Sequence, residues 1–290
     1  MAENGKNAEW QVGRLLSTTT KFLGEKGSAT PRLDAELLLA KVLKMSKVQL
    51  YVNFERPLAD NELGEYRGLV RRRAAFEPVA YILGEKEFYG LKIKTTAAAL
   101  IPRPETEHLI DEAIRLAKEL WPEEPIRLAD IGCGSGAISL ALAGQLRAEI
   151  QAVDISPEAL ALAEENSESL GLSEKINFYQ GDLMGPLEGR FHLICANLPY
   201  IPSSEMQSLM PDVGCHEPHL ALDGGPEGLD LILRLLEQAS SRIEPQGRAL
   251  LEIWPASLSA LEKQAEACGW HLEDTVRDLA GHHRIAVMKQ

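Results

Sequence analysis

The chain has 290 residues, 45% of them hydrophobic and 25% charged, enough to form one large hydrophobic core or two smaller ones. Its formal net charge of -13 argues against a protein that binds long nucleic acid directly through phosphates, but leaves protein partners open. We find no apolar run of membrane-spanning length, and residues 1–6 do not resemble a secretory signal. The four cysteines lack CxxC spacing and are expected to be reduced thiols, which favours a cytoplasmic location.

The amino-terminal part, residues 1–77, is expected to form a domain of helices alone. Apolar residues recur at helical spacing over residues 10–24, and Thr30-Pro31 is typical of the first turn of a second helix. A later helix through residues 63–70 ends at three arginines, residues 71–73, whose positive charge suits the carboxyl end of a helix. We expect these arginines to be solvated; the alternative is contact with an anionic partner.

The pattern changes at residue 78, where short apolar runs with glycines replace the helical spacing. Residues 79–84 and 88–93 are expected to be short strands bent at Gly84 and Gly90. Residues 78–100 are therefore predicted to form a β linker or hairpin between two domains.

From residue 101 to the carboxyl end, strands and helices alternate, which predicts an α/β domain with a mostly parallel sheet covered by helices on both faces. The proline-rich run at 101–107 leads into its first helix, and Thr106 or Glu105 there either caps that helix or contacts a ligand. Strands are expected at residues 126–131, 148–153, 176–180, 191–195 and 248–254, with a closing pair at 271–275 and 284–288. Helices are expected at residues 109–120, 137–143, 157–170, 229–243 and 257–268.

A glycine-rich turn, Gly132-Cys133-Gly134-Ser135-Gly136, follows the first of these strands. Glycine has no Cβ to clash, so such a turn lets the backbone approach a ligand closely. Its third glycine comes two residues after the second, whereas the dinucleotide fingerprint requires three. No phosphate-binding lysine follows it, so the turn is not a P-loop.

Acidic residues end three of the expected strands. Asp154 can accept hydrogen bonds from ribose hydroxyls, and Asp182 from an adenine amino group with Leu183 covering the ring. Asp130 can either orient the glycine turn or meet a ligand ammonium group. Together with a turn that lacks phosphate-binding groups, these residues favour an adenosyl ligand without phosphate, namely S-adenosylmethionine.

The fourth strand ends at Asn197, at the edge of the sheet where α/β proteins bind ligands. Pro199 restricts Leu198 to an extended conformation, so the Leu198 carbonyl projects beside the Asn197 side-chain oxygen. With Tyr200 as an aromatic wall, these two acceptors would hold a planar NH2 group of an amide or an exocyclic amine. The alternative is a simple Asn-Pro turn after a strand.

These motifs resemble those of known methyltransferases. Residues 130–136 with Asp154 are similar to the cofactor site of class I methyltransferases, and residues 197–200 to the motif of enzymes that methylate planar nitrogen. From about residue 10 to the end, the chain resembles the protein-(glutamine-N5) methyltransferases of peptide chain release factors (PrmC/HemK). Further matching segments lie at residues 32–40, 77–84, 88–90, 101–107, 217–218, 221–225, 228–229 and 278–284.

The resemblance implies transfer of a methyl group from S-adenosylmethionine to the glutamine amide in the Gly-Gly-Gln loop of release factors, leaving S-adenosylhomocysteine. It implies that the helical domain binds the release factor; we expect a monomer and no strong general base. The acceptor and catalytic residues implied are Asn197, Leu198, Pro199 and Tyr200. The cofactor contacts implied are Asp130, Gly132, Cys133, Gly134, Ser135, Gly136, Asp154, Ile155, Asp182, Leu183 and Asn197.

The chain departs from this family's pattern at two places. Leu198 stands where the family usually has proline, and Asn-Leu-Pro-Tyr also occurs in ribosomal RNA adenine-N6 dimethyltransferases. Residues 252–256, Glu-Ile-Trp-Pro-Ala, replace the common Glu-Ile-Gly run. The alternatives are therefore an adenine-N6 methyltransferase acting on RNA or DNA, which would need a basic face, and a non-catalytic adaptor. We expect no metal site, because the scattered histidines offer too few convergent ligands.

Overall fold

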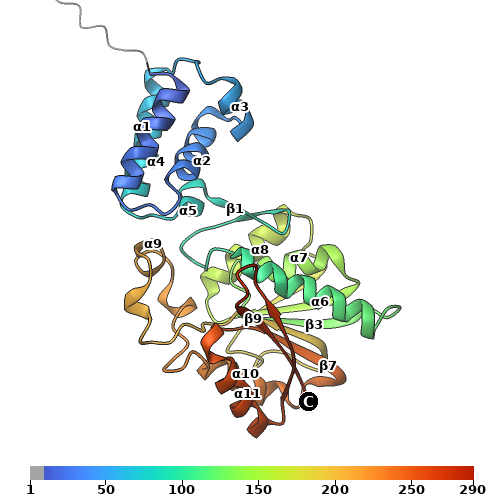
Figure 1. Ribbon diagram of the computed structural model, residues 1–290. Helices are drawn as coiled ribbons and strands as arrows, with labels where there is room; N and C mark the ends of the chain where they lie inside the picture. Colours follow the sequence, from blue (N-terminus) through green and yellow to red (C-terminus); the bar gives the residue numbers. More distant parts are fainter. Residues whose placement is uncertain (1–9) are drawn as a thin grey trace, which may run out of the picture. The chain divides into compact units, whose positions relative to one another are not determined.

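The computed structural model describes residues 10–290, which form two compact units (Figure 1). The first unit runs to Gly84 and includes a short segment from much later in the chain, Pro211–His216. The second unit comprises Glu85–Met210 and Glu217–Gln290. Each unit has its own buried hydrophobic core, so each is described separately.

The first unit is a helical bundle, as the apolar spacing predicts. Leucines on facing helices, such as Leu16 and Leu38, form most of its core, and Tyr66 is buried among them. The Tyr66 hydroxyl donates to the Ala35 carbonyl at 3.1 Å, which satisfies a buried polar group. The helices are α1 (Val12–Glu25), α2 (Pro31–Leu43), α3 (Lys47–Val52), α4 (Asp60–Ala74), α5 (Val79–Leu83) and α9 (Pro211–Gly214).

The strand expected at residues 79–84 is wrong, because Val79–Leu83 form helix α5. Gly84 ends this helix with a φ of 78°, a left-handed conformation that glycine adopts without strain. Ile82 is buried in the core of the first unit. A short apolar run does not by itself distinguish a buried turn of helix from a strand, and here tertiary packing decides for helix.

The expectation that the arginines at 71–73 are solvated is wrong for Arg73. Its buried guanidinium donates to Asp34 at 2.7 Å and lies 3.5 Å from Asp212, next to the start of α9. Asp34 also accepts hydrogen bonds from the Ser28 and Thr30 hydroxyls. Removal of a partner would leave the buried charge of Arg73 less well paired, which is costly. The pair between Arg73 and Asp212 therefore helps to attach the α9 segment to the bundle.

The second unit is built on a seven-stranded sheet in the order β5-β4-β3-β6-β7-β9-β8. The first five strands run parallel, and β9 and β8 add an antiparallel pair at the edge, which confirms the predicted sheet. The strand order reverses between β3 and β6, and such a reversal is where α/β sheets bind ligands. The strands are β3 (Ile126–Ile131), β4 (Ala148–Asp154), β5 (Ile176–Gln180), β6 (Phe191–Ala196), β7 (Ile243–Glu252), β8 (His271–Arg277) and β9 (His283–Lys289).

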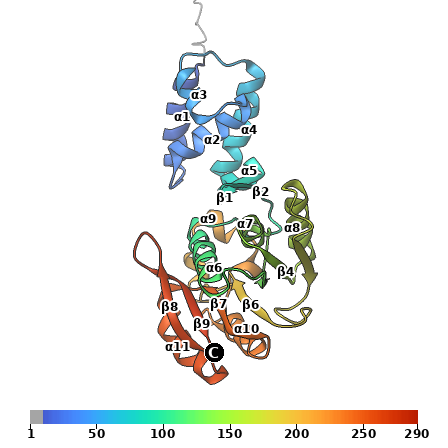
Figure 2. The ribbon, with the colours of Figure 1, turned by 90° about the vertical axis from the view of Figure 1, so that its right-hand side faces the viewer.

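Helices cover both faces of this sheet, as predicted (Figures 1 and 2). Successive strand residues alternate between two cores: Leu128 packs with α6, α7 and α8, whereas Ala129 packs with α10 and α11. Both faces are therefore apolar, as expected for a mostly parallel sheet. The helices are α6 (Glu107–Leu120), α7 (Ala137–Gln145), α8 (Pro157–Ser169), α10 (Asp230–Ala239) and α11 (Leu258–Ala265).

An antiparallel hairpin, β1 (Glu85–Phe88) and β2 (Leu91–Lys94), precedes the sheet. It replaces the single bent strand expected at residues 88–93, since Gly90 lies in the turn with a φ of 74°. Asn166 of α8 fixes the hairpin, because its side chain accepts from the Lys94 N–H at 2.8 Å and donates to the Lys94 carbonyl at 3.1 Å.

Residues 10–290 contain no helix that is both long enough and apolar enough to cross a membrane. Within that same range, no three His, Cys, Asp or Glu side chains are grouped so as to hold a metal ion. All four cysteines are free, and Cys133 and Cys195 are buried. Burial raises the pKa of both buried thiols well above the ordinary value, so neither is a ready nucleophile.

Candidate active site

A cavity of about 350 Å³ lies at the carboxyl ends of the central parallel strands, where the strand order reverses. The predicted cofactor residues that line it are Gly132, Gly134, Asp154, Ile155, Asp182, Leu183 and Asn197. Leu198 and Pro199 of the acceptor motif line the same cavity. The predicted residues that do not line it are Asp130, Cys133, Ser135, Gly136 and Tyr200. The fold thus brings the glycine turn, the acidic residues Asp154 and Asp182, and the Asn197 motif together around one cavity.

The glycine turn owes its shape to the neighbouring strand. The N–H groups of Gly132 and Cys133 both donate to the Val153 carbonyl of β4, at 2.8 and 2.9 Å. Gly132 has a φ of 73°, and a Cβ there would lie 2.9 Å from the Leu198 side chain. The left-handed backbone conformation is the main reason for glycine at this position, and a Cβ would in addition displace the tip of the Leu198 side chain.

Asp130 supports the turn from the protein interior. It is fully buried, and its Oδ2 accepts from the backbone N–H of Ser139 at 3.0 Å and from the Ser139 hydroxyl at 2.6 Å. Its Oδ1 has no hydrogen-bond partner among the described residues. Burial raises the pKa of Asp130 to about 6. Of the two roles considered for Asp130, these contacts favour orientation of the turn, because they join the end of β3 to α7.

Asp154 holds two backbone groups and faces the cavity. Its Oδ2 accepts from the Gly134 N–H at 2.8 Å, and its Oδ1 accepts from the Ser156 N–H at 2.9 Å. Each carboxylate oxygen can accept a second hydrogen bond, so both oxygens remain suitable for ribose hydroxyls. The carboxylate is thus held rigidly by the backbone on either side of it.

The rest of the lining suits an adenosyl group without phosphate. Among the described residues that line the cavity, Arg234 is the only Lys or Arg, and it pairs with Asp182 at 2.5 Å. A phosphate would therefore compete with a carboxylate for the one positive charge available. Ile155 and the buried Leu183 provide apolar surface, and Leu183 has a left-handed φ of 51°, a strained conformation typical of ligand sites.

The acceptor motif is connected to two buried side chains from distant parts of the chain. The Asn197 side-chain nitrogen donates to the Thr106 hydroxyl at 3.1 Å, and Thr106 donates to Glu252 Oε2 at 2.6 Å. The Tyr200 hydroxyl donates to Glu252 Oε1 at 2.9 Å. Burial raises the pKa of Glu252, against the opposing effect of its two hydroxyl donors. Burial likewise raises the pKa of Tyr200 well above its ordinary value.

The backbone of the acceptor motif is held by a glycine-containing segment about twenty residues later in the sequence, residues 222–228. The Ile201 N–H donates to the Leu222 carbonyl at 3.1 Å, and the Gly224 N–H returns a bond to the Ile201 carbonyl at 2.9 Å. A Cβ on Gly224 would lie 2.5 Å from the Pro199 oxygen. A Cβ on Gly228 would lie 2.1 Å from the carbonyl oxygen of Tyr200, so the two chains approach as closely as glycine allows.

The sequence singled out Thr106 as a helix cap or a ligand contact, but not for the role that it has here. Thr106 occupies the N-cap position of α6 without a capping hydrogen bond, and its hydroxyl accepts from the acceptor motif. Two further residues that shape the site were missed. Glu252 ends β7, next to β6 in the sheet, and an acidic residue at a strand end was the signal that could have identified it. Asn166 also donates to the Ser135 carbonyl at 3.0 Å and so fixes the glycine turn; no local sequence pattern indicates this contact.

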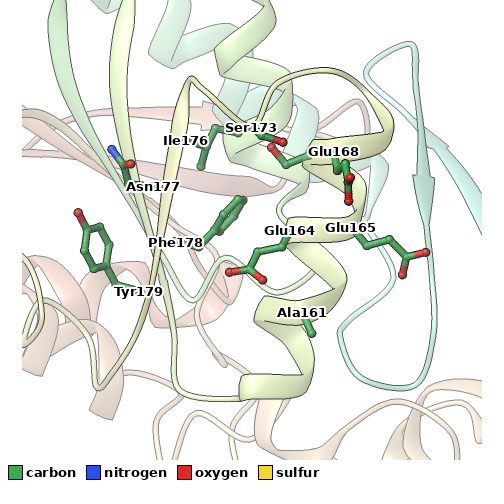
Figure 3. Close-up of a pocket in the computed structure, with 10 residues that line it drawn as sticks. Ala161, Glu164, Glu165, Glu168, Ser173, Ile176, Asn177, Phe178 and Tyr179 are labelled. Carbon is green, nitrogen blue, oxygen red and sulfur yellow. The ribbon is translucent and has the colours of Figure 1, made fainter.

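A wider hollow of about 640 Å³ lies between α8 and β5, outside this cavity (Figure 3). Its acidic side chains do not converge: Glu164 points towards β5, whereas Glu165 points to the opposite side of the helix (Figure 3). Glu165 is paired with Lys94 at 2.5 Å. The hollow is therefore acidic, solvated surface rather than a second site.

Comparisons with known proteins agree with this geometry. Residues 14–84 match the model of the PrmC N-terminal domain, and residues 128–214 match a methyltransferase domain. A protein of Rhodopirellula baltica named release factor glutamine methyltransferase is 41% identical over 100% of both chains, and one of Geobacter sulfurreducens with the same name is 42% identical over 84% of both. A solved methyltransferase of Pyrococcus furiosus, 17% identical, matches with a TM-score of 0.52 over 79% of this chain and 98% of its own, which shows a shared fold.

Proposed function

The chain belongs to the release factor glutamine methyltransferases, and from this premise we propose how its cavity carries out the reaction. It is an enzyme that uses S-adenosylmethionine to methylate a glutamine of a release factor. We propose that the acceptor is the side-chain amide nitrogen of the glutamine in the Gly-Gly-Gln loop. The observation that carries this proposal is the Asn197 carboxamide, which lines the cavity while its nitrogen is held by Thr106.

In this proposal the residues around the glycine turn would hold the cofactor. Asp154 would accept from the ribose hydroxyls, Asp182 would accept from the adenine amino group, and Ile155 and Leu183 would cover the ring faces. Asp130, Cys133, Ser135 and Gly136 hold the turn in shape from behind. When bound, S-adenosylmethionine supplies a methyl group attached to a positively charged sulfur.

The acceptor residues compensate for the low reactivity of an amide nitrogen. The oxygen of Asn197 and the carbonyl of Leu198 each accept one N–H of the substrate amide, which fixes its plane and favours positive charge on nitrogen as the new N–C bond forms. Orientation of this kind is worth up to about 7–11 kcal/mol for well-aligned reactants. Pro199 holds residue 198 extended, Tyr200 supports the motif from outside the cavity through its bond to Glu252, and the product nitrogen releases one proton to water.

The family's usual proline is replaced by Leu198, and the contacts of this side chain support retention of activity. Leu198 is buried, and the tip of its side chain lies beside Gly132 where a Cβ would otherwise stand. The backbone carbonyl at 198 needs no particular side chain. The substitution therefore changes the packing between the acceptor motif and the glycine turn but preserves the acceptor.

We propose that the helical domain, residues 1–77, binds the release factor, with residues 78–100 as linker and residues 101–290 as catalytic domain. Three exposed apolar side chains on α3 support a protein partner: Val48, Tyr51 and Val52 are 73%, 51% and 78% exposed. The net charge of -13 supports the absence of direct nucleic acid contact. We further propose a cytoplasmic monomer. The adenine-N6 alternative gains no support from the relatives, which are named for glutamine.

Tandem mass spectrometry of a release factor incubated with the enzyme and S-adenosylmethionine tests this proposal. We expect one added methyl group on the glutamine of the Gly-Gly-Gln loop. A release factor whose loop glutamine is replaced by alanine is the matched control and should gain none. Methylation at another residue would contradict the proposed acceptor, and methyl transfer to RNA or DNA adenine would contradict the assigned substrate class.

A further inference from the structure

Three side chains from distant segments form a continuous series of hydrogen bonds behind the acceptor position. Asn197 follows β6, Thr106 precedes α6 and Glu252 ends β7, so 91 residues separate the first pair and 146 the second. Thr106 is 4% exposed and Glu252 is 1% exposed. Water therefore has little access to the groups that join Asn197 to the carboxylate.

The number of hydrogens available determines which group donates and which accepts in each of these hydrogen bonds. A carboxylate only accepts, so the single hydrogen of the Thr106 hydroxyl is used in the bond to Glu252. The Thr106 oxygen can then only accept from Asn197, which requires the carboxamide nitrogen to face Thr106. The carboxamide oxygen consequently faces the other way. The two ends of a carboxamide have nearly the same shape, so hydrogen bonding, and not packing, decides between them.

The same carboxylate also fixes Tyr200, the last residue of the acceptor motif. Tyr200 uses its one hydrogen to donate to the second oxygen of Glu252, so both oxygens accept from residues of this network. The Arg284 guanidinium lies close enough to lower the pKa of Glu252, whereas Glu105 raises it and burial raises it most. The hydrogen bonds from Thr106 and Tyr200 oppose the effect of burial by favouring the ionised form of Glu252, which accepts both hydroxyl hydrogens.

We propose that Thr106 and Glu252 are positioning residues that fix the Asn197 carboxamide with its oxygen towards the substrate, and so make the site select glutamine over glutamate. This inference rests on the proposed function, in which that oxygen accepts from the substrate amide. A glutamine side chain offers two N–H donors to the oxygens of Asn197 and Leu198, whereas a glutamate carboxylate offers none and is repelled. If the carboxamide turned over, its NH2 group would instead attract a carboxylate.

The test compares two forms of one release factor, with glutamine or glutamate in the Gly-Gly-Gln loop. Isothermal titration calorimetry with the full-length enzyme and S-adenosylhomocysteine gives the Kd of each form, and the ratio of the two Kd values measures selectivity. For the unmodified enzyme we expect glutamine to be favoured by about 100-fold, since a site built for N–H donors rejects a group that lacks them. Thr106→Val keeps the shape but removes the hydroxyl, and should reduce the ratio by about tenfold.

Two control variants and one repeat of the test separate orientation from general structural damage. Thr106→Ser retains the hydroxyl and should keep the ratio within about threefold of the unmodified enzyme. Thr106→Ala, which loses no capping bond, repeats the test should the valine variant fail to bind S-adenosylhomocysteine. Thr275→Val removes a half-buried hydroxyl bonded to His283 in the edge strands and should leave the ratio unchanged.

The outcomes are distinguishable. An enzyme that does not favour the glutamine form at all contradicts the proposed function together with this inference. An enzyme that favours glutamine, and a valine variant that keeps the full ratio, contradict the positioning role alone. A purely structural role would make valine as good as serine, because valine matches the shape of threonine more closely. Reduced selectivity in Thr106→Val, together with retained selectivity in Thr106→Ser, would support the proposal.

Discussion

The two halves of the cavity are held by different kinds of contact. On the cofactor side, backbone N–H groups, glycine conformations and the strand-end carboxylate of Asp154 define the surface, and most partners come from neighbouring strands. On the acceptor side, buried side chains from three distant segments meet around Glu252. The difference indicates that the cofactor half is sensitive to side chains added at the glycine turn, whereas the acceptor half depends on individual hydroxyl and carboxyl groups.

The largest effect on cofactor binding is expected from adding a methyl group to the cofactor half. Gly132→Ala places a Cβ 2.9 Å from Leu198 at a φ of 73°, so the turn must deform. We expect S-adenosylhomocysteine affinity to fall by about 100-fold or more, given about 1–3 kcal/mol for overpacking and a similar strain cost. Gly144→Ala, in α7 with no atom near its new methyl group, is the matched control and should leave affinity unchanged. Calorimetric titration measures both, and equal affinities for the two variants would refute the backbone account.

Asp130 should make stability depend on pH in a direction opposite to that of a salt-bridged carboxylate. Its folded pKa of about 6 lies above the ordinary value of 3.8, so its contribution to stability is fully present below pH 3.8 and is lost as pH rises through 6. Asp130→Asn removes this dependence. Between about pH 4 and pH 7 the unfolding free energy of the unmodified protein, relative to the variant, should fall by about 2–3 kcal/mol.

Chemical denaturation of both proteins across that pH range measures this difference. If the difference in unfolding free energy between the two proteins stayed constant or rose with pH, Asp130 would be charged in the folded protein, which would contradict the raised pKa.

Tyr200→Phe removes one hydroxyl from the acceptor half and nothing from the cofactor half. Glu252 then loses one of its two hydroxyl donors, which costs about 1–3 kcal/mol for a buried charged acceptor. We expect kcat to fall by about tenfold while S-adenosylhomocysteine affinity stays within about twofold. Steady-state kinetics and titration give both values, and an equal loss in the two would show that the halves are not independent.

The smallest effect is expected at the edge of the cavity. Arg234 and Asp182 form an ion pair in which both side chains are half exposed, and such pairs contribute about 0–1 kcal/mol. Arg234→Gln should therefore change S-adenosylmethionine affinity by less than about fivefold. A loss comparable with that of Gly132→Ala would assign Arg234 a direct role in binding the cofactor.

The same division explains what could be predicted from the sequence. The glycine turn and the strand-end residues Asp154 and Asn197 were found because their partners follow from local pattern and the geometry of a parallel sheet. The roles of Thr106 and Glu252 were not, because their contact joins residues 146 apart and neither lies in a pattern that demands it. The resemblance to a known family identified the acceptor motif, but it did not indicate which residues orient the Asn197 side chain.

The helical unit shows the same limit. Helices α1, α2 and α4 follow from apolar spacing, whereas the burial of Arg73 depends on Asp34, 39 residues earlier, and on Asp212, 139 residues further along the chain. The helix at Val79–Leu83 was mistaken for a strand because five residues are too few to show a period. Long-range packing decides both cases, and it leaves no local trace in the sequence.

The most direct test of the account measures methyl transfer and cofactor binding side by side in Asn197→Ala. The account predicts that transfer to release factor glutamine falls by about a thousandfold, as for removal of a preorganised hydrogen-bonding group, while S-adenosylhomocysteine affinity stays within about fivefold. Asn177→Ala, on the exposed part of β5 outside the cavity, should change neither quantity. Retained transfer in Asn197→Ala would contradict the account, because the proposed amide acceptor would then be dispensable.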